Sequence, residues 1–161
     1  NHLENNILLG LALYRALQAD GQSSTDAYTE TRDYLAATAQ QQANRIRAFK
    51  RFLPKRFRYP VVRWFVRQQM HTLFPADGWD WTWLEDSPRR MAFDGTRCLY
   101  LDTLRAYGAA ELIPAFCNTD DVMGKGMEPE VVFERQYTLG RGDDHCDFCF
   151  RNTRFSGNLP R

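Results

Sequence analysis

The segment WDWTWLEDSPRRMAFDG, residues 79–95, decides the fold class. Its first half alternates, which places Trp79, Trp81 and Trp83 on one face of a β-strand. The dipeptide Ser87-Pro88 is a turn signal, and a second apolar run, RMAFDG, follows it at 90–95. The segment therefore predicts a β-hairpin with strands over 79–85 and 90–95.

A second hairpin is predicted near the end of the chain. The runs VVFERQYT (131–138) and CDFCFR (146–151) read as strands, and the glycines Gly140 and Gly142 mark the turn between them. In the first of these strands, Val131, Phe133, Arg135 and Tyr137 should share one face.

Two helices are predicted between the hairpins. Thr96 can cap a helix from Arg97 to Tyr107, which Gly108 would end. A further helix should run from about Glu111 to Met123, because Pro114 is tolerated in a first turn.

The N-terminal part is predicted to be helical. One helix is expected over 4–19, a second from Ser23, Ser24 or Thr25 to about Phe52, and a third over 61–73, with Pro54 and Pro60 breaking the chain between them. The chain thus predicts an α+β fold, in which helices of the N-terminal part and the inserted helices cover an antiparallel sheet of about four strands. We expect a single domain over 1–161, with a helical part at 1–75 and the site-bearing part at 76–155.

Charge and composition argue against several classes of partner. The net charge is +1, and nine cations lie between Arg45 and Arg67 among six aromatic residues. Such a stretch can bind nucleic acid, but it is more typical of a solvated helix face whose aromatic side chains point inward, so we expect no nucleic-acid partner. The apolar run Ile7–Leu13 is too short to span a membrane, and we expect no membrane partner. With four cysteines and no visible secretory signal, reduced thiols and a cytoplasmic location are expected; homo-oligomerisation stays open.

The cysteines Cys146 and Cys149 form a Cys-x-x-Cys spacing that is not a site. On a strand, residues three apart lie roughly 10 Å apart and face opposite ways, so no disulfide joins them, and no second ligand pair is present for a zinc knuckle. Cys146 should face inward with Phe148 and Phe150, while Asp147, Cys149 and Arg151 face the other way.

Two charges fall on faces that are otherwise apolar. Arg135 lies in the row that Val131, Phe133 and Tyr137 form on one face of the predicted strand. Asp120 interrupts the stripe that Ile113, Phe116 and Cys117 form on one side of the predicted helix. They can pair with each other, or they can line a pocket with Cys117 and Cys146. Cys98 falls in the first turn of its predicted helix, where the helix dipole lowers the pKa of a thiol.

Here the sequence resembles a known family. The stretches TRCLYLDTLRAYGAAELIPAFCNTDDVM and FERQYTLGRGDDHCDFCF are similar to the L-2-amino-thiazoline-4-carboxylic acid hydrolase family over about residues 96–151. The family pattern is a cysteine that opens a helix, then G..EL...FC..D, then R..TLA.G...CDF. It falls on Cys98, Gly108, Glu111, Leu112, Cys117, Asp120, Arg135, Thr138, Leu139, Gly142, Cys146, Asp147 and Phe148. Gly140 replaces the usual alanine, and Cys149 lies outside the pattern.

The resemblance implies a hydrolase that adds water to a cyclic thioimidate-like ring and expels the thiolate. On this view Cys117, Asp120 and Cys146 are the catalytic candidates. Arg135 would clamp the carboxylate of a small-molecule substrate, and the other substrate-binding candidates are Cys98, Thr138 and Asp147. Asp147 can equally be a structural ligand of a turn.

We expect no cofactor. Two other readings stay open. One is a binding module in which Cys98, Cys117, Cys146 and Asp120 hold a small ligand or a soft metal such as zinc without turnover. The other is lyase chemistry that uses two thiols and a carboxylate.

Overall fold

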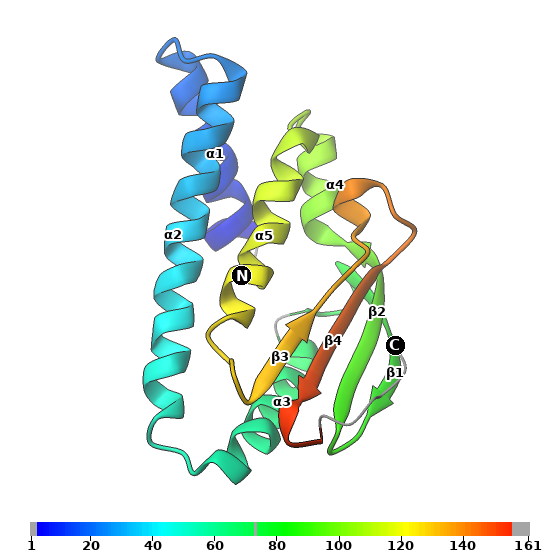
Figure 1. The fold of residues 1–161 in the computed structure, drawn as a ribbon. Helices are drawn as coiled ribbons and strands as arrows, with labels where there is room; N and C mark the ends of the chain where they lie inside the picture. Colours follow the sequence, from blue (N-terminus) through cyan, green and yellow to red (C-terminus); the bar gives the residue numbers. More distant parts are fainter. Residues whose placement is uncertain (1–2, 73, 156–161) are drawn as a thin grey trace.

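The protein is an α+β fold in which helices cover one face of a four-stranded antiparallel sheet (Figure 1). A computed structural model describes residues 3–72 and 74–155. The strands are β1 (Trp79–Asp86), β2 (Arg90–Cys98), β3 (Val131–Glu134) and β4 (Cys146–Asn152), in the order β1-β2-β4-β3. The helices are α1 (Leu8–Ala19), α2 (Ser24–Lys50), α3 (Lys55–Thr72), α4 (Leu99–Ala106) and α5 (Ile113–Gly124), and the shorter helical turns are η1 (Leu3–Ile7), η2 (Ala110–Leu112), η3 (Leu139–Arg141) and η4 (Thr153–Phe155). The predicted fold class is confirmed.

The first hairpin forms as predicted. Ser87 closes the turn, since its backbone N–H donates to the Arg90 carbonyl at 2.9 Å and its Oγ accepts the N–H of Arg89 and of Arg90, each at 3.1 Å. Trp81 lies across Gly95 on the neighbouring strand, where a β-carbon would come within 2.4 Å of the indole ring. This close approach requires glycine at position 95.

The two faces of the sheet differ in chemistry. On the covered face, Met91 pairs with Phe150 and Phe93 with Phe148, and this aromatic layer packs against Tyr59 and other apolar side chains of α3. The opposite face carries ion pairs between Glu85 and Arg90 and between Glu134 and Arg151. Alternation along β2 and β4 therefore separates a core face from a solvated face, as the sequence predicts.

The helices form a second layer beside the sheet, in which α2 and α5 pack closely (Figure 1). Three of the buried residues of α2 are small, namely Ala27, Ala39 and Ala43. Just after α5, a β-carbon on Gly126 would lie 2.6 Å from the Ala43 carbonyl oxygen, so glycine lets the chain approach α2 closely. The Ser23 side chain caps α2 by accepting the Asp26 N–H, which confirms one of the predicted caps.

A buried ion cluster ties the end of α2 to the segment before β3. The Lys50 Nζ atom lies 2.8 Å from Glu130 Oε2 and donates to the Met127 carbonyl at 2.9 Å, while Arg58 of α3 pairs with the other oxygen of Glu130. Burial acts to raise the pKa of Glu130, but its bonds to Lys50 and Arg58 outweigh burial and hold the pKa below its usual range.

Three predicted boundaries are wrong. Helix α3 begins at Lys55 and contains Pro60 near its start, where the proline removes one helical hydrogen bond without ending the helix. Thr96 caps no helix, because β2 continues to Cys98 and α4 starts at Leu99. Strand β3 ends at Glu134 rather than at residue 138. The predicted end of α3 at residue 73 lies outside the described residues.

The expected inward direction of the aromatic side chains between residues 45 and 67 is also wrong. Tyr59 is buried, but Phe49 is 60% exposed, Phe52 86%, Phe57 46%, Trp64 65% and Phe65 53%. Within the described ranges, no helix combines the length and apolar composition that crossing a membrane requires.

The ion cluster gives a prediction for stability. Glu130→Gln leaves the ammonium group of Lys50 buried without a carboxylate, so the free energy of unfolding should fall by about 3 kcal/mol in urea denaturation. Asp33→Asn, which breaks the exposed pair with Arg32, should cost less than about 1 kcal/mol.

The same cluster predicts a pH dependence. Because the folded pKa of Glu130 lies below its usual 4.5, the wild type should lose part of its stability as pH falls below about 4.5. The Glu130→Gln variant should lack this pH-dependent part of the free energy of unfolding. Equal losses for the Glu130 and Asp33 variants would contradict a buried cluster.

Candidate active site

Three thiols from separate elements come together where the helical layer meets the sheet. Cys98 ends β2, Cys117 lies on α5 and Cys146 begins β4. The charge of Cys98 and of Cys146 would each raise the pKa of the Cys117 thiol, which places the three within electrostatic reach of one another. The structure therefore brings these three predicted site residues near one another, while their roles in a site stay predictions.

The short turn η3 packs against these thiols. The Leu139 N–H donates to Cys146 Sγ at 3.3 Å, and a β-carbon on Gly140 would lie 2.9 Å from Cys117 Sγ. Thr138, a predicted substrate-binding residue, is buried at the start of this turn, and its N–H donates to Asp143 Oδ2 at 2.6 Å. The glycine at 140 thus lets the backbone come into contact with Cys117.

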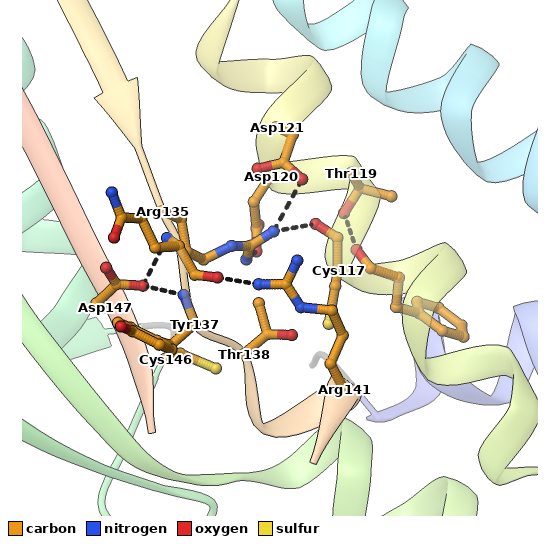
Figure 2. A network of polar contacts seen from close by, with 12 residues as sticks. Cys117, Thr119, Asp120, Asp121, Arg135, Tyr137, Thr138, Arg141, Cys146 and Asp147 are labelled. Atoms are coloured by element: carbon orange, nitrogen blue, oxygen red, sulfur yellow. Dashed lines mark hydrogen bonds and ion pairs between the residues drawn. The ribbon is translucent and has the colours of Figure 1, made fainter. Parts of the chain in front are cut away.

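Arg135 joins the sheet layer to α5, and its side chain is only 4% exposed (Figure 2). Nη1 donates to Asp120 Oδ2 at 2.9 Å, and Nη2 donates to the Cys117 carbonyl at 2.8 Å and to Asp121 Oδ2 at 3.0 Å. The guanidinium also lies over the rings of Phe133 and Phe148, at 5.8 and 5.5 Å from their centroids. Of the two arrangements that the sequence left open, the structure shows the pairing of Arg135 with Asp120, and Asp121 is a second partner that the helical stripe did not indicate.

Asp120 has an unusual acidity. The protein atoms around its carboxyl group desolvate it and raise its pKa to about 6, although Arg135 acts in the opposite direction. Its side chain is still 40% exposed. A partly accessible carboxyl group that titrates near neutral pH is suited to accepting and returning a proton.

The thiols are not activated. Burial raises the pKa of Cys117 to about 12 and also raises the pKa values of Cys98 and Cys146. The predicted lowering for Cys98 is wrong: the N–H groups of Leu101 and Tyr100 do favour its thiolate, but burial outweighs them. All three are neutral thiols at neutral pH.

Asp147 binds backbone. Its Oδ1 accepts the N–H of Gln136 at 2.8 Å and of Tyr137 at 2.6 Å, and so holds the segment that leads from β3 to Thr138 (Figure 2). This arrangement fits the structural reading of Asp147, while its role in substrate binding stays a prediction. Tyr137 is 48% exposed and does not continue the inward row of β3.

Tyr100 is a neighbour of the cluster that sequence reasoning missed. Burial raises the pKa of its phenol, and the nearby charges of Asp120 and Cys98 act in the same direction. Its hydroxyl accepts a hydrogen bond from Asn6 Nδ2 at 3.3 Å. No periodic pattern marks Tyr100. It lies in the first turn of α4, whose start at Leu99 the sequence predicted two residues too early, at Arg97.

Cys149 is separate from the other thiols, as predicted. The charges of Glu134, Arg90 and Arg151 act on its pKa, so it lies on the solvated face of the sheet. Within the ranges 3–72 and 74–155, no three His, Cys, Asp or Glu side chains are placed to share a metal ion.

Two open hollows on the surface lie away from the cluster. One, of about 510 Å³, is lined by Gln22, Asp26, Thr29, Glu30 and Asp33, and the other, of about 520 Å³, by Lys55, Arg56, Pro129, Glu130, Thr153 and Arg154. Neither includes a predicted site residue, so neither is the predicted pocket around Cys117.

The contacts of Arg135 predict the effect of removing its charge. Arg135→Met keeps much of the volume but leaves two carboxylates and a carbonyl without their donor, so the free energy of unfolding should fall by about 3 kcal/mol. Arg141→Met, which alters a side chain that is 58% exposed, should cost less than about 1 kcal/mol in the same thermal or urea melt. Unchanged stability of the Arg135 variant would mean that this guanidinium is solvated.

Comparison with known proteins agrees with the motifs of the sequence. The model of the L-2-amino-thiazoline-4-carboxylic acid hydrolase family matches residues 1–150, which extends the similarity from the motifs at 96–151 to the helical N-terminal part. No curated protein and no solved structure matches the chain. The match covers nearly the whole chain, and the protein belongs to the L-2-amino-thiazoline-4-carboxylic acid hydrolase family.

Proposed function

We propose that the protein is a hydrolase that opens the ring of a small cyclic sulfur–nitrogen compound of the 2-amino-thiazoline-4-carboxylate type. Membership of the family supports this class of reaction. The observation that carries the proposal is the carboxyl group of Asp120, which has a pKa of about 6 and lies one helical turn from Cys117.

The reaction adds one water molecule. The water oxygen bonds to the ring carbon between sulfur and nitrogen, the carbon–sulfur bond breaks, and the sulfur leaves with the electron pair and takes up a proton. The product is an N-carbamoyl-cysteine. A group that first removes a proton from water and then gives it to the departing sulfur meets both needs.

Asp120 is the best candidate for this group. Above pH 6 it is a carboxylate that can accept the proton of the attacking water, and its raised pKa makes it a stronger base than an ordinary aspartate. Arg135 holds one of its oxygens, which fixes the direction of the carboxyl group.

Direct attack by water is more consistent with this site than a covalent step through Cys117. The pKa of Cys117 is raised to about 12 and that of Asp120 only to about 6, so transfer of the thiol proton to Asp120 would be strongly unfavourable. We therefore assign Cys117 and Cys146 to contact with the ring as neutral, polarisable thiols rather than to attack.

Arg135 can bind the substrate carboxylate if the substrate takes the place of Asp121. Asp120 is held on Nη1 and Asp121 on Nη2, and the Asp121 side chain is 50% exposed. A carboxylate from solution could replace Asp121 on Nη2 and leave Asp120 in position. In the protein without substrate, Asp121 therefore occupies the position that we assign to the substrate carboxylate.

The role of Asp120 predicts a pH profile. Release of thiol from 2-amino-thiazoline-4-carboxylate, followed with a thiol reagent, should fall as pH drops below about 6, because Asp120 becomes protonated. Asp120→Asn should abolish this dependence and lower kcat about 10²–10⁴-fold. Arg135→Met should raise the pH at which thiol release falls, because losing the cation that favours the carboxylate form raises the pKa of Asp120.

Combined variants test whether Cys117 positions the ring for the proton transfer by Asp120. If it does, Cys117→Ala, Asp120→Asn and the double variant should show losses that are not additive, because both residues serve the same step. Cys149→Ser, on the opposite face of the sheet, is the control and should retain activity. Additive losses would indicate separate packing roles, and a wild type that releases no thiol from any thiazoline would refute the proposed reaction.

The displacement of Asp121 predicts a gain in affinity. Asp121→Asn removes a charged competitor for Arg135, so KM for a thiazoline carboxylate should fall several-fold while kcat changes little. Asp102→Asn removes the same charge from a partly exposed pair with Arg97 and should leave KM unchanged. A rise in KM for the Asp121 variant would show that Asp121 helps to bind the substrate.

A further inference from the structure

The turn between α2 and α3 lies at one end of the molecule (Figure 1). Aromatic side chains in this turn and on the adjoining helices are exposed. Phe49 and Phe52 come from the end of α2 and the turn, and Phe57 and Trp64 lie seven residues apart on α3, so that they share one stripe of that helix. Their exposed fractions are 60%, 86%, 46% and 65%. We call this set, together with the cations Arg45, Arg51, Lys55 and Arg56, the basic aromatic tip.

The positive charge of the tip is not compensated within the described chain. Of the nine cations between residues 45 and 67, Lys50 and Arg58 pair with Glu130, and Arg63 and Arg67 pair with Asp86. Arg47 donates to the Asn44 side chain and to the Lys125 carbonyl. No ion pair found among residues 3–72 and 74–155 includes the four cations of the tip. The sequence has no acidic residue between Asp33 and Asp77 that could reach them locally.

A hollow of about 520 Å³ opens beside the tip. It is lined by Lys55, Arg56 and Arg154, together with Pro129, Thr153 and Glu130. The charge of Glu130 is already balanced by Lys50 and Arg58, so the hollow is positive overall. Its positive charge suits an anionic lipid headgroup.

We propose that the basic aromatic tip docks the protein on the surface of an anionic phospholipid membrane. Phenylalanine and tryptophan side chains would enter the region between headgroups and acyl chains, and the four cations would contact the anionic headgroups. This is peripheral binding, without a spanning helix, and it is independent of the hydrolase reaction.

Two other occupants fit the tip less well. A second copy that paired through the same patch would bring the uncompensated cations of both copies together with no acid between them. A nucleic acid would balance the charge, but single strands are bound in grooves that follow the backbone, whereas Phe49 and Phe52 lie beside and in the turn between α2 and α3, at one end of the molecule (Figure 1).

Co-sedimentation of the full chain with vesicles tests the proposal. The protein should bind vesicles that contain equal parts of phosphatidylglycerol and phosphatidylcholine, and bind pure phosphatidylcholine vesicles far more weakly. High salt should weaken the binding. Phe52→Ser should lower the partition coefficient about tenfold, and Arg51→Gln or Arg56→Gln about fivefold each.

Matched controls lie away from the tip, on α4 and just after it. Tyr107→Ser alters a tyrosine that is 60% exposed, and Arg105→Gln removes an exposed cation; both should bind vesicles like the wild type. Tryptophan fluorescence should shift to the blue on binding, and Trp64→Phe should lose much of this shift while it retains binding. Circular dichroism melts check that each variant is folded.

Three results would overturn the proposal. The first is no binding to anionic vesicles, or binding that the tip variants do not change. The second is binding of a single-stranded oligonucleotide that depends on Phe52 and Arg51 in the absence of vesicle binding. The third is self-association in solution that Phe52→Ser abolishes, also without vesicle binding, which would assign the tip to a second copy.

Discussion

The guanidinium group of Arg135 is the interaction on which the site depends. It lies just beyond the end of β3 with 4% of its side chain exposed, and it bonds to two carboxylates and one carbonyl of α5. A buried charge is tolerated only when its donors are satisfied. Those acceptors all lie on one turn of α5, so the charge fixes that turn against the sheet. The rings of Phe133 and Phe148 fill the space beside it.

Competition between burial and charge then decides the chemistry of each group near Arg135. Burial favours the neutral form of every acid, and the cation favours the ionised form. For Cys117 burial dominates and the pKa rises to about 12, whereas for Asp120 the balance leaves a pKa of about 6. The same environment thus makes the thiol inert and brings the carboxyl group into the range of physiological pH. This difference is our reason for proposing Asp120 as the proton-transfer group, although cysteines are the more conspicuous feature of the sequence.

Much of the fold and part of the site follow from the sequence because they rest on periodicity. Alternation placed Cys146 with Phe148 and Phe150 on the core face and Cys149 on the solvated face. An isolated charge on each of two apolar faces indicated that Arg135 and Asp120 each need a partner, and pairing with each other was one of the two arrangements left open. Local sequence patterns fail where residues from other parts of the chain determine a property. Burial by the surrounding elements, which sequence does not give, reverses the expected effect of the α4 terminus on Cys98. Asp121 was missed because the stripe of residues on one side of α5 includes only Asp120. The guanidinium group of Arg135 has several donors and reaches both adjacent carboxylates.

The error in the direction of the aromatic side chains has a physical reason that connects the fold with the tip. Helix α3 can turn only one face to the sheet, and Tyr59, Val62, Val66 and Met70 supply that face. The remaining aromatic residues have no layer to cover them, because α2 packs on α5 instead. The ion cluster of Lys50, Arg58 and Glu130 fixes the turn between the two helices, so the aromatic side chains stay at the surface whatever their hydrophobicity. The buried network takes Lys50 and Arg58 from the surface, whereas Arg45, Arg51, Lys55 and Arg56 remain exposed near the aromatic rings. The position of the tip is thus a consequence of the packing of α2 and α3 and does not depend on the chemistry around Asp120.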